Sequence, residues 1–85
     1  MTKEPFILQI KTREGIIFKD QVLSLTCIND TGEFDILAKH SNFISLIQDE
    51  LTITKKDGTV QDLAFFAGLL QVINNQTNIY LGFKK

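Results

Sequence analysis

The segment LTITKKDGTVQDLAFF, residues Leu51–Phe66, has the pattern of two strands joined by a tight turn. Apolar and polar residues alternate in its first four positions, and a second strand-like run covers Val60 to Phe66. A period of two places successive side chains on opposite faces of a β-strand. Asp57-Gly58 between two alternating runs is a strong short-range signal for a β-hairpin. The segment therefore predicts two antiparallel neighbouring strands.

The same period of two extends outward to both ends of the chain. Further strand-like runs cover residues 6–12, 16–27, 34–37, 43–47, 69–73 and 77–83. Expected apolar faces are Phe6, Leu8 and Ile10; Leu23, Leu25 and Cys27; and Ile79, Leu81 and Phe83. Residues 19–21 predict a bulge or a bend, and Ala67-Gly68 predicts a break or a kink. About eight to ten short strands without a convincing helix predict an all-β fold, an antiparallel sandwich or barrel.

Length and composition limit what the chain can be. Its 85 residues make one small domain, and 44% hydrophobic with 22% charged residues is typical of a globular protein. A formal net charge of −1 argues against a general nucleic-acid binder, which usually has a basic face. The single Cys27 excludes an internal disulfide. The sequence contains no signal peptide and no apolar run of the ~18 residues that a membrane span needs.

Candidate catalytic and metal-binding residues are few. His40 is the only histidine, and its neighbour Ser41 points to the opposite face if the chain is extended. A nucleophile for His40 would have to come from elsewhere in the fold, from Ser24, Ser45 or Cys27. Glu33 and Asp35 share a face of an extended segment, but one histidine and one cysteine 13 positions apart do not give metal-ligand spacing. We expect no catalytic site, no metal and no cofactor.

The run GEFDILAKHSNFISLI, residues 32–47, resembles the signature segment of the epsilon subunit of F-type ATP synthases, called delta in mitochondria. The residues that match the family pattern are Gly32, Glu33, Phe34, Ile36, Leu37, His40, Phe43, Ile44 and Ser45. The resemblance extends over the whole chain, through FILQIKTREGIIFKDQVLSLTC before this run and AFFAGLLQVINNQTNIYL after it. It implies the family's N-terminal domain, an antiparallel β-sandwich of about ten short strands in two sheets over residues 1–85.

The resemblance also implies a function and a set of partners. The subunit would be a non-catalytic part of the central stalk, between the gamma subunit and the membrane c-ring, and would help to couple ion flow to ATP synthesis. It would lie on the cytoplasmic face of the inner (plasma) membrane, attached only through its partner subunits. The residues expected to face those partners are Glu33, Phe34, Asp35, His40, Ser41, Asn42 and Phe43.

The sequence departs from the family pattern around His40. Ala38, Lys39 and Asn42 replace Pro, Gly and Pro, so we expect a differently shaped loop. The family's subunit usually continues with a helical hairpin of about 45–50 residues, which carries most of its inhibition of ATP hydrolysis. This chain stops at Lys85, and we therefore expect coupling without inhibition.

Two other functions remain open from the sequence. An unrelated β-sandwich module that binds a glycan or a peptide would need an exposed aromatic platform. A small enzyme would need His40 in a concave pocket beside a nucleophile, with a shifted pKa.

Overall fold

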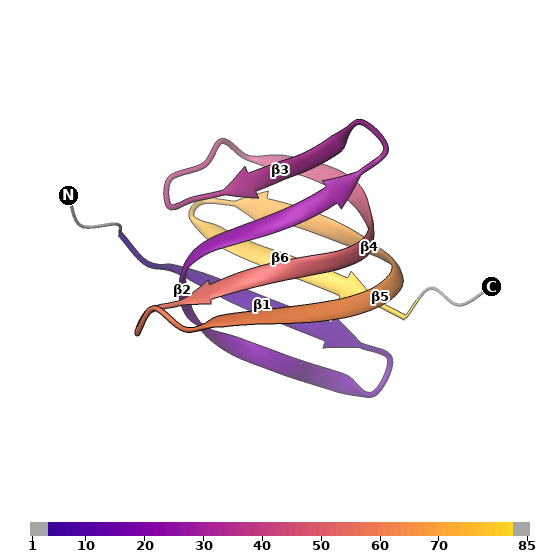
Figure 1. The fold of residues 1–85 in the computed structure, drawn as a ribbon, viewed down its shortest axis with the longest axis horizontal. Helices are drawn as coiled ribbons and strands as arrows, with labels where there is room; N and C mark the ends of the chain where they lie inside the picture. Colours follow the sequence, from indigo (N-terminus) through magenta and orange to yellow (C-terminus); the bar gives the residue numbers. More distant parts are fainter. Residues whose placement is uncertain (1–3, 83–85) are drawn as a thin grey trace.

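Six β-strands form the fold in the computed structural model, which describes residues 4–82 (Figure 1). They are β1 (Phe6–Thr12), β2 (Gly15–Asn29), β3 (Gly32–Ile36), β4 (Phe43–Lys55), β5 (Val60–Ile73) and β6 (Gln76–Leu81). The all-β prediction is confirmed, and residues 4–82 contain no helix. The number of strands is smaller than expected because β2, β4 and β5 have 15, 13 and 14 residues and continue through the expected interruptions.

The strands close on themselves like a barrel. They lie in the order β1-β6-β5-β4-β2-β3, and an additional pairing of β1 with β2 joins the ends of the sheet. The first half of β2 pairs with β1, and its second half pairs with β3 and β4. The pairing is antiparallel, as predicted, except that β1 and β6 run parallel. To pair with β1 in its first half and with β3 and β4 in its second half, β2 must bend. Figure 1 shows it curving around one side of the molecule.

Register shifts allow the long strands to bend without ending. In the β4–β5 pair, Gln48 lies opposite Ala67 and Asp49 lies opposite Phe65, so the register shifts by one residue at Phe66. This extra residue is the bulge that stands in place of the break predicted at Ala67-Gly68. A second shift lies between Val22 and Ser24, slightly after the predicted interruption at residues 19–21, through which β2 continues.

The core is a cluster of side chains that face the inside of the closed sheet. Its buried members are Phe6, Leu8, Ile10, Val22, Leu25, Cys27, Ile36, Ile47, Leu51, Ile53, Leu70, Val72 and Ile79. The predicted face of the first strand is buried as expected. In β2 the register shift brings Val22 into the core and leaves Leu23 half-buried, which corrects the predicted face. Ile79 is buried and Leu81 half-buried, and Phe83 lies outside the described residues.

The predicted Asp57-Gly58 hairpin joins β4 to β5. The Gly58 amide donates a hydrogen bond to the Lys55 carbonyl at 2.9 Å, and Gly58 has a φ of 92°, which glycine adopts without strain. The Asp57 carboxylate accepts hydrogen bonds from the Thr59 hydroxyl at 2.7 Å and the Thr59 amide at 2.9 Å. These two bonds lower the pKa of Asp57, because they stabilise its charged form.

Candidate functional site

The loop that carries His40 connects β3 to β4 and comprises residues 37–42, here called the 37–42 loop. The His40 amide donates a hydrogen bond to the Leu37 carbonyl at 3.2 Å and closes a four-residue turn. Lys39, the third residue of this turn, has a φ of 64°. This left-handed conformation is unfavourable for a lysine, whereas glycine adopts it readily. The family pattern that the sequence resembles has glycine at this position.

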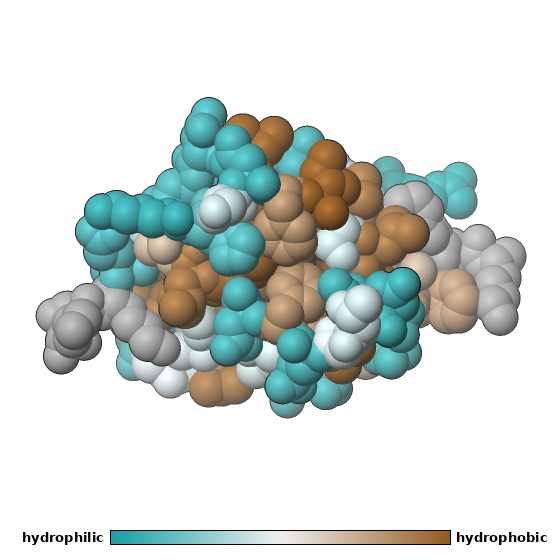
Figure 2. Space-filling view, turned by 90° about the horizontal axis from the view of Figure 1, so that it is seen from above, coloured by the Kyte–Doolittle hydropathy of each residue, from teal (hydrophilic) through white to brown (hydrophobic). Residues whose placement is uncertain are grey.

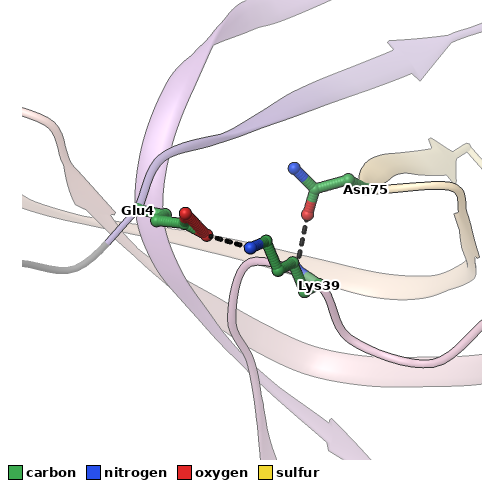
Figure 3. A network of polar contacts seen from close by, with 3 residues as sticks. All are labelled: Glu4, Lys39 and Asn75. Carbon is green, nitrogen blue, oxygen red and sulfur yellow. Dashed lines mark hydrogen bonds and ion pairs between the residues drawn. The ribbon is translucent and has the colours of Figure 1, made fainter.

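Three polar contacts fix the loop to distant parts of the chain. The Lys39 amide donates a hydrogen bond to the Asn75 side-chain oxygen, and the Asn74 amide donates one to the Asn42 side-chain oxygen at 2.9 Å. The Lys39 ammonium lies 3.2 Å from the Glu4 carboxylate. Figure 3 shows Lys39 between Glu4 and Asn75, which come from opposite ends of the chain. The loop therefore contacts the segment before β1 and the β5–β6 turn.

Asn74 and Asn75 form the two-residue turn between β5 and β6. Their φ values are 49° and 65°, the positive pair that a type I′ hairpin requires. Asparagine tolerates this conformation better than most residues. The turn thus places the Asn74 amide N–H and the Asn75 side-chain oxygen beside the 37–42 loop.

The rings of Phe34 on β3 and His40 in the loop both pack against the ring of Phe43 on β4. The Phe34 and Phe43 ring centroids are 5.9 Å apart at 67°, an edge-to-face contact, and the His40 and Phe43 centroids are 4.9 Å apart. Both phenylalanines are half-buried against the core. His40 Nδ1 lies 2.7 Å from the Ser41 carbonyl, so in the neutral imidazole Nδ1 carries the proton and donates it. The His40 side chain therefore hydrogen-bonds within the loop itself.

The structure brings together five of the seven residues expected at the partner interface: Phe34, His40, Ser41, Asn42 and Phe43. The other two, Glu33 and Asp35, lie on the exposed outer face of β3. Three strand steps separate Glu33 from Ile36, where β3 ends, a distance of about 10 Å. Asp35 accepts a hydrogen bond from the Thr26 hydroxyl at 2.7 Å. The acids therefore flank the loop rather than meet His40.

Exposed apolar side chains on β4 and β5 add a surface that the sequence prediction did not include. Ile44 is 63% and Leu46 71% exposed, and Leu46 lies opposite the half-buried Leu69. Ile73, at the end of β5, is 42% exposed. Figure 2 shows apolar residues reaching the surface between polar ones. The available signal was that Ile44 and Leu46 share one face of the strand while Phe43 and Ile47 occupy the other.

Two observations on the described residues bear on thiol chemistry and metal binding. Burial raises the pKa of Cys27 to about 12, with a smaller contribution from the charge of Asp35, so its thiol stays protonated and is a poor nucleophile. Within residues 4–82, no three His, Cys, Asp or Glu residues come together to hold a metal ion. Over the same range, no helix has the length and apolar character to cross a membrane.

Two open hollows lie beside the strands, and His40 lines neither of them. One, of about 190 Å³, is lined by Glu4, Leu23, Leu37 and Ala38. The other, of about 370 Å³, is lined by Lys11, Thr12, Arg13, Tyr80, Leu81 and Gly82. An enzyme built around His40 would need that residue in a concave pocket beside a nucleophile.

Comparison with known families gives a match over nearly the whole chain. The family model described as "ATP synthase, Delta/Epsilon chain, beta-sandwich domain" matches residues 5–81. Among curated proteins, the ATP synthase epsilon chain of Sulfurimonas denitrificans is 35% identical over 66 residues, 76% of this chain and 51% of its own length. That of a Nitratiruptor species is 36% identical over 70 residues, 81% of this chain and 54% of its own length. The chain spans about half the length of these relatives.

Solved structures show a similar fold at low sequence identity. A chain of the Euglena gracilis mitochondrial ATP synthase, in a complex of OSCP, F1 and c-ring, superimposes with a TM-score of 0.85 at 19% identity. The match covers 91% of this chain and 50% of that one. A chain of the Tetrahymena thermophila mitochondrial ATP synthase central stalk and c-ring gives 0.78 at 13% identity, covering 96% and 66%. These likenesses support the fold described above.

Proposed function

The chain belongs to the delta/epsilon family of ATP synthase subunits, and we propose that it is a non-catalytic part of the central stalk that joins the gamma subunit to the membrane c-ring. In this role it supports the coupling of ion flow to ATP synthesis. The match of residues 5–81 to the family's β-sandwich domain carries the proposal. The chain is held peripherally, at the cytoplasmic face of the inner (plasma) membrane, through its partner subunits.

The surface around the 37–42 loop has the chemistry that such a junction needs. Ser41 and Asn42 are exposed, and Glu33 offers a carboxylate on the flank. An exposed ion pair contributes only ~0–1 kcal/mol, so these polar groups set orientation more than affinity. Affinity comes from apolar burial at about 25 cal/mol per Å², for which Ile44 and Leu46 are available. We propose that the loop and this apolar face together form the partner interface.

The alternative of a glycan-binding or peptide-binding module has weak support. It would need an exposed aromatic platform, and Phe66 is the only phenylalanine among residues 4–82 that is exposed, at 59%. The half-buried Phe34 and Phe43 pack on the core instead.

Reconstitution tests the coupling role. An ATP synthase stripped of its native delta/epsilon subunit is supplied with this 85-residue chain, and ATP synthesis driven by an ion gradient is measured beside ATP hydrolysis. We expect synthesis to recover severalfold while hydrolysis is not inhibited. Strong inhibition of hydrolysis would contradict the proposal that the domain couples without inhibiting. A failure to restore synthesis by a chain that binds would remove the coupling role.

A further inference from the structure

We propose that Asn75 is a positioning residue that holds the 37–42 loop in its docking shape, so that this loop and the β5–β6 turn act as one recognition edge. The inference deepens the proposed function and rests on it for the identity of the partners. The turn and the loop are far apart in sequence: 36 positions separate Lys39 from Asn75 and 32 separate Asn42 from Asn74.

The first step of the argument is the backbone of Lys39. Its φ of 64° lies in the left-handed region, which L-residues other than glycine, asparagine and aspartate rarely occupy. Such a conformation persists only where the surroundings fix it. A lysine in an exposed loop therefore needs an external restraint to remain in this conformation.

The second step is to identify that restraint. The ion pair to Glu4 acts at the far end of the lysine side chain, and both of its side chains are exposed, by 75% and 58%. It is therefore weak and does not act on the backbone of Lys39 directly. The hydrogen bond from the Lys39 amide to Asn75 acts on the backbone itself. The local turn bond from the His40 amide to the Leu37 carbonyl acts on the same backbone, and Asn75 is the distant group that fixes the strained residue.

The third step connects this restraint to the docking surface. The Asn74 amide binds the Asn42 side chain at the other end of the loop, and His40 packs on Phe43. Lys39 and Asn42 are thus each held by a hydrogen bond to the β5–β6 turn, on either side of His40 and Ser41. His40 and Ser41 lie between these two hydrogen-bonded residues, and His40 Nδ1 is bonded to the Ser41 carbonyl. Loss of the Asn75 contact therefore releases the loop at Lys39, while the hydrogen bond at Asn42 remains.

The two asparagines provide a matched pair of variants. Asn75→Gly removes the side-chain acceptor and creates Asn-Gly, the favoured pair for a type I′ hairpin, so the turn itself is not weakened. Asn74→Gly also suits a positive φ and retains the backbone amide that binds Asn42. Both substitutions therefore keep the turn, and only Asn75→Gly removes the restraint on Lys39. Asn75→Asp keeps an acceptor oxygen and serves as the conservative rescue.

The experiment measures two quantities on the full chain. Water-exchange rates of the Lys39 and His40 amides are measured by NMR, and affinity is measured for the purified gamma subunit and c-ring of the same organism. We expect Asn75→Gly to speed exchange and weaken binding roughly three- to tenfold, the loss of about one hydrogen bond. Asn74→Gly and Asn75→Asp should stay within about twofold of the wild type on both measurements.

Three other results would each contradict the inference or part of it. Equal exchange rates in Asn75→Gly and Asn74→Gly would show that Asn75 does not hold the loop. Faster exchange with unchanged affinity would separate the restraint from docking and leave the proposed function intact. A wild-type chain that binds neither subunit would overturn the proposed function and the docking role together, while the exchange rates would still show whether the restraint exists.

Discussion

Replacing Gly68 with valine is expected to destabilise the domain by about 3 kcal/mol or more, at the upper end of the range for overpacking. Gly68 is buried in β5, where an added Cβ would lie 2.7 Å from Leu81 Cδ2 and 3.1 Å from the Tyr80 carbonyl oxygen. The leucine side chain can move aside, but the oxygen belongs to the backbone of the neighbouring strand. The β5–β6 pairing must therefore shift to accommodate the side chain.

Urea denaturation followed by circular dichroism measures this effect. Ala64→Val on the exposed face of the same strand is the control, and it should change the unfolding free energy by about 0.5 kcal/mol or less. A Gly68→Val variant as stable as the control would show that β5 and β6 do not approach each other as closely as described.

Leu25→Ala is expected to cost about 2–5 kcal/mol of unfolding free energy, as for other large-to-small core substitutions. Leu25 is fully buried and lies opposite Ile36 of β3 and Ile53 of β4, so its side chain joins three strands. A chain of 85 residues has a total stability of only about 4–13 kcal/mol. The variant should therefore lose a large share of its stability and unfold at a much lower urea concentration.

Leu23→Ala tests the register shift that distinguishes these two leucines. Leu23 is half-buried, and its truncation should cost less than half as much as that of Leu25. Equal losses in the two variants would contradict the observed register and favour the simple alternation of Leu23, Leu25 and Cys27.

Local patterns in the sequence were sufficient for the parts of the fold that depend on near neighbours. Asp57-Gly58 correctly predicted the β4–β5 hairpin, and the alternation of Phe6, Leu8 and Ile10 correctly predicted a buried face. The continuity of β4 and β5 was missed because a bulge contains no obligatory turn residue: Asp49 has a φ of 71° and Phe66 is the extra residue. The parallel pairing of β1 with β6 joins the two ends of the chain, and no local signal encodes it.

In the candidate site, too, contacts between near neighbours in the sequence could be predicted and contacts between distant segments could not. The rings of Phe34 and Phe43 and the loop that carries His40 follow one another in the sequence, and the structure brings them into contact. The contact of Asn75 with Lys39 could not be predicted, because it depends on the exact register of β4 and β5, in which Phe43 lies opposite Val72. The expected difference in loop shape stays a prediction, and Lys39, at the position where the family pattern has glycine, has a glycine-like φ.

Site-specific cross-linking tests the central claim, that the 37–42 loop faces the gamma subunit and the c-ring. Ser41→Cys is labelled with a photoreactive maleimide; Cys27, buried with a pKa raised to about 12, should not react. The labelled chain is assembled into ATP synthase membranes and irradiated, beside a Glu14→Cys control in the turn after β1, the opposite end of that strand from Glu4 and the loop. We predict cross-links from position 41 to gamma or c subunits and few from position 14. No cross-link from position 41, or equal yields from both positions, would contradict the claim.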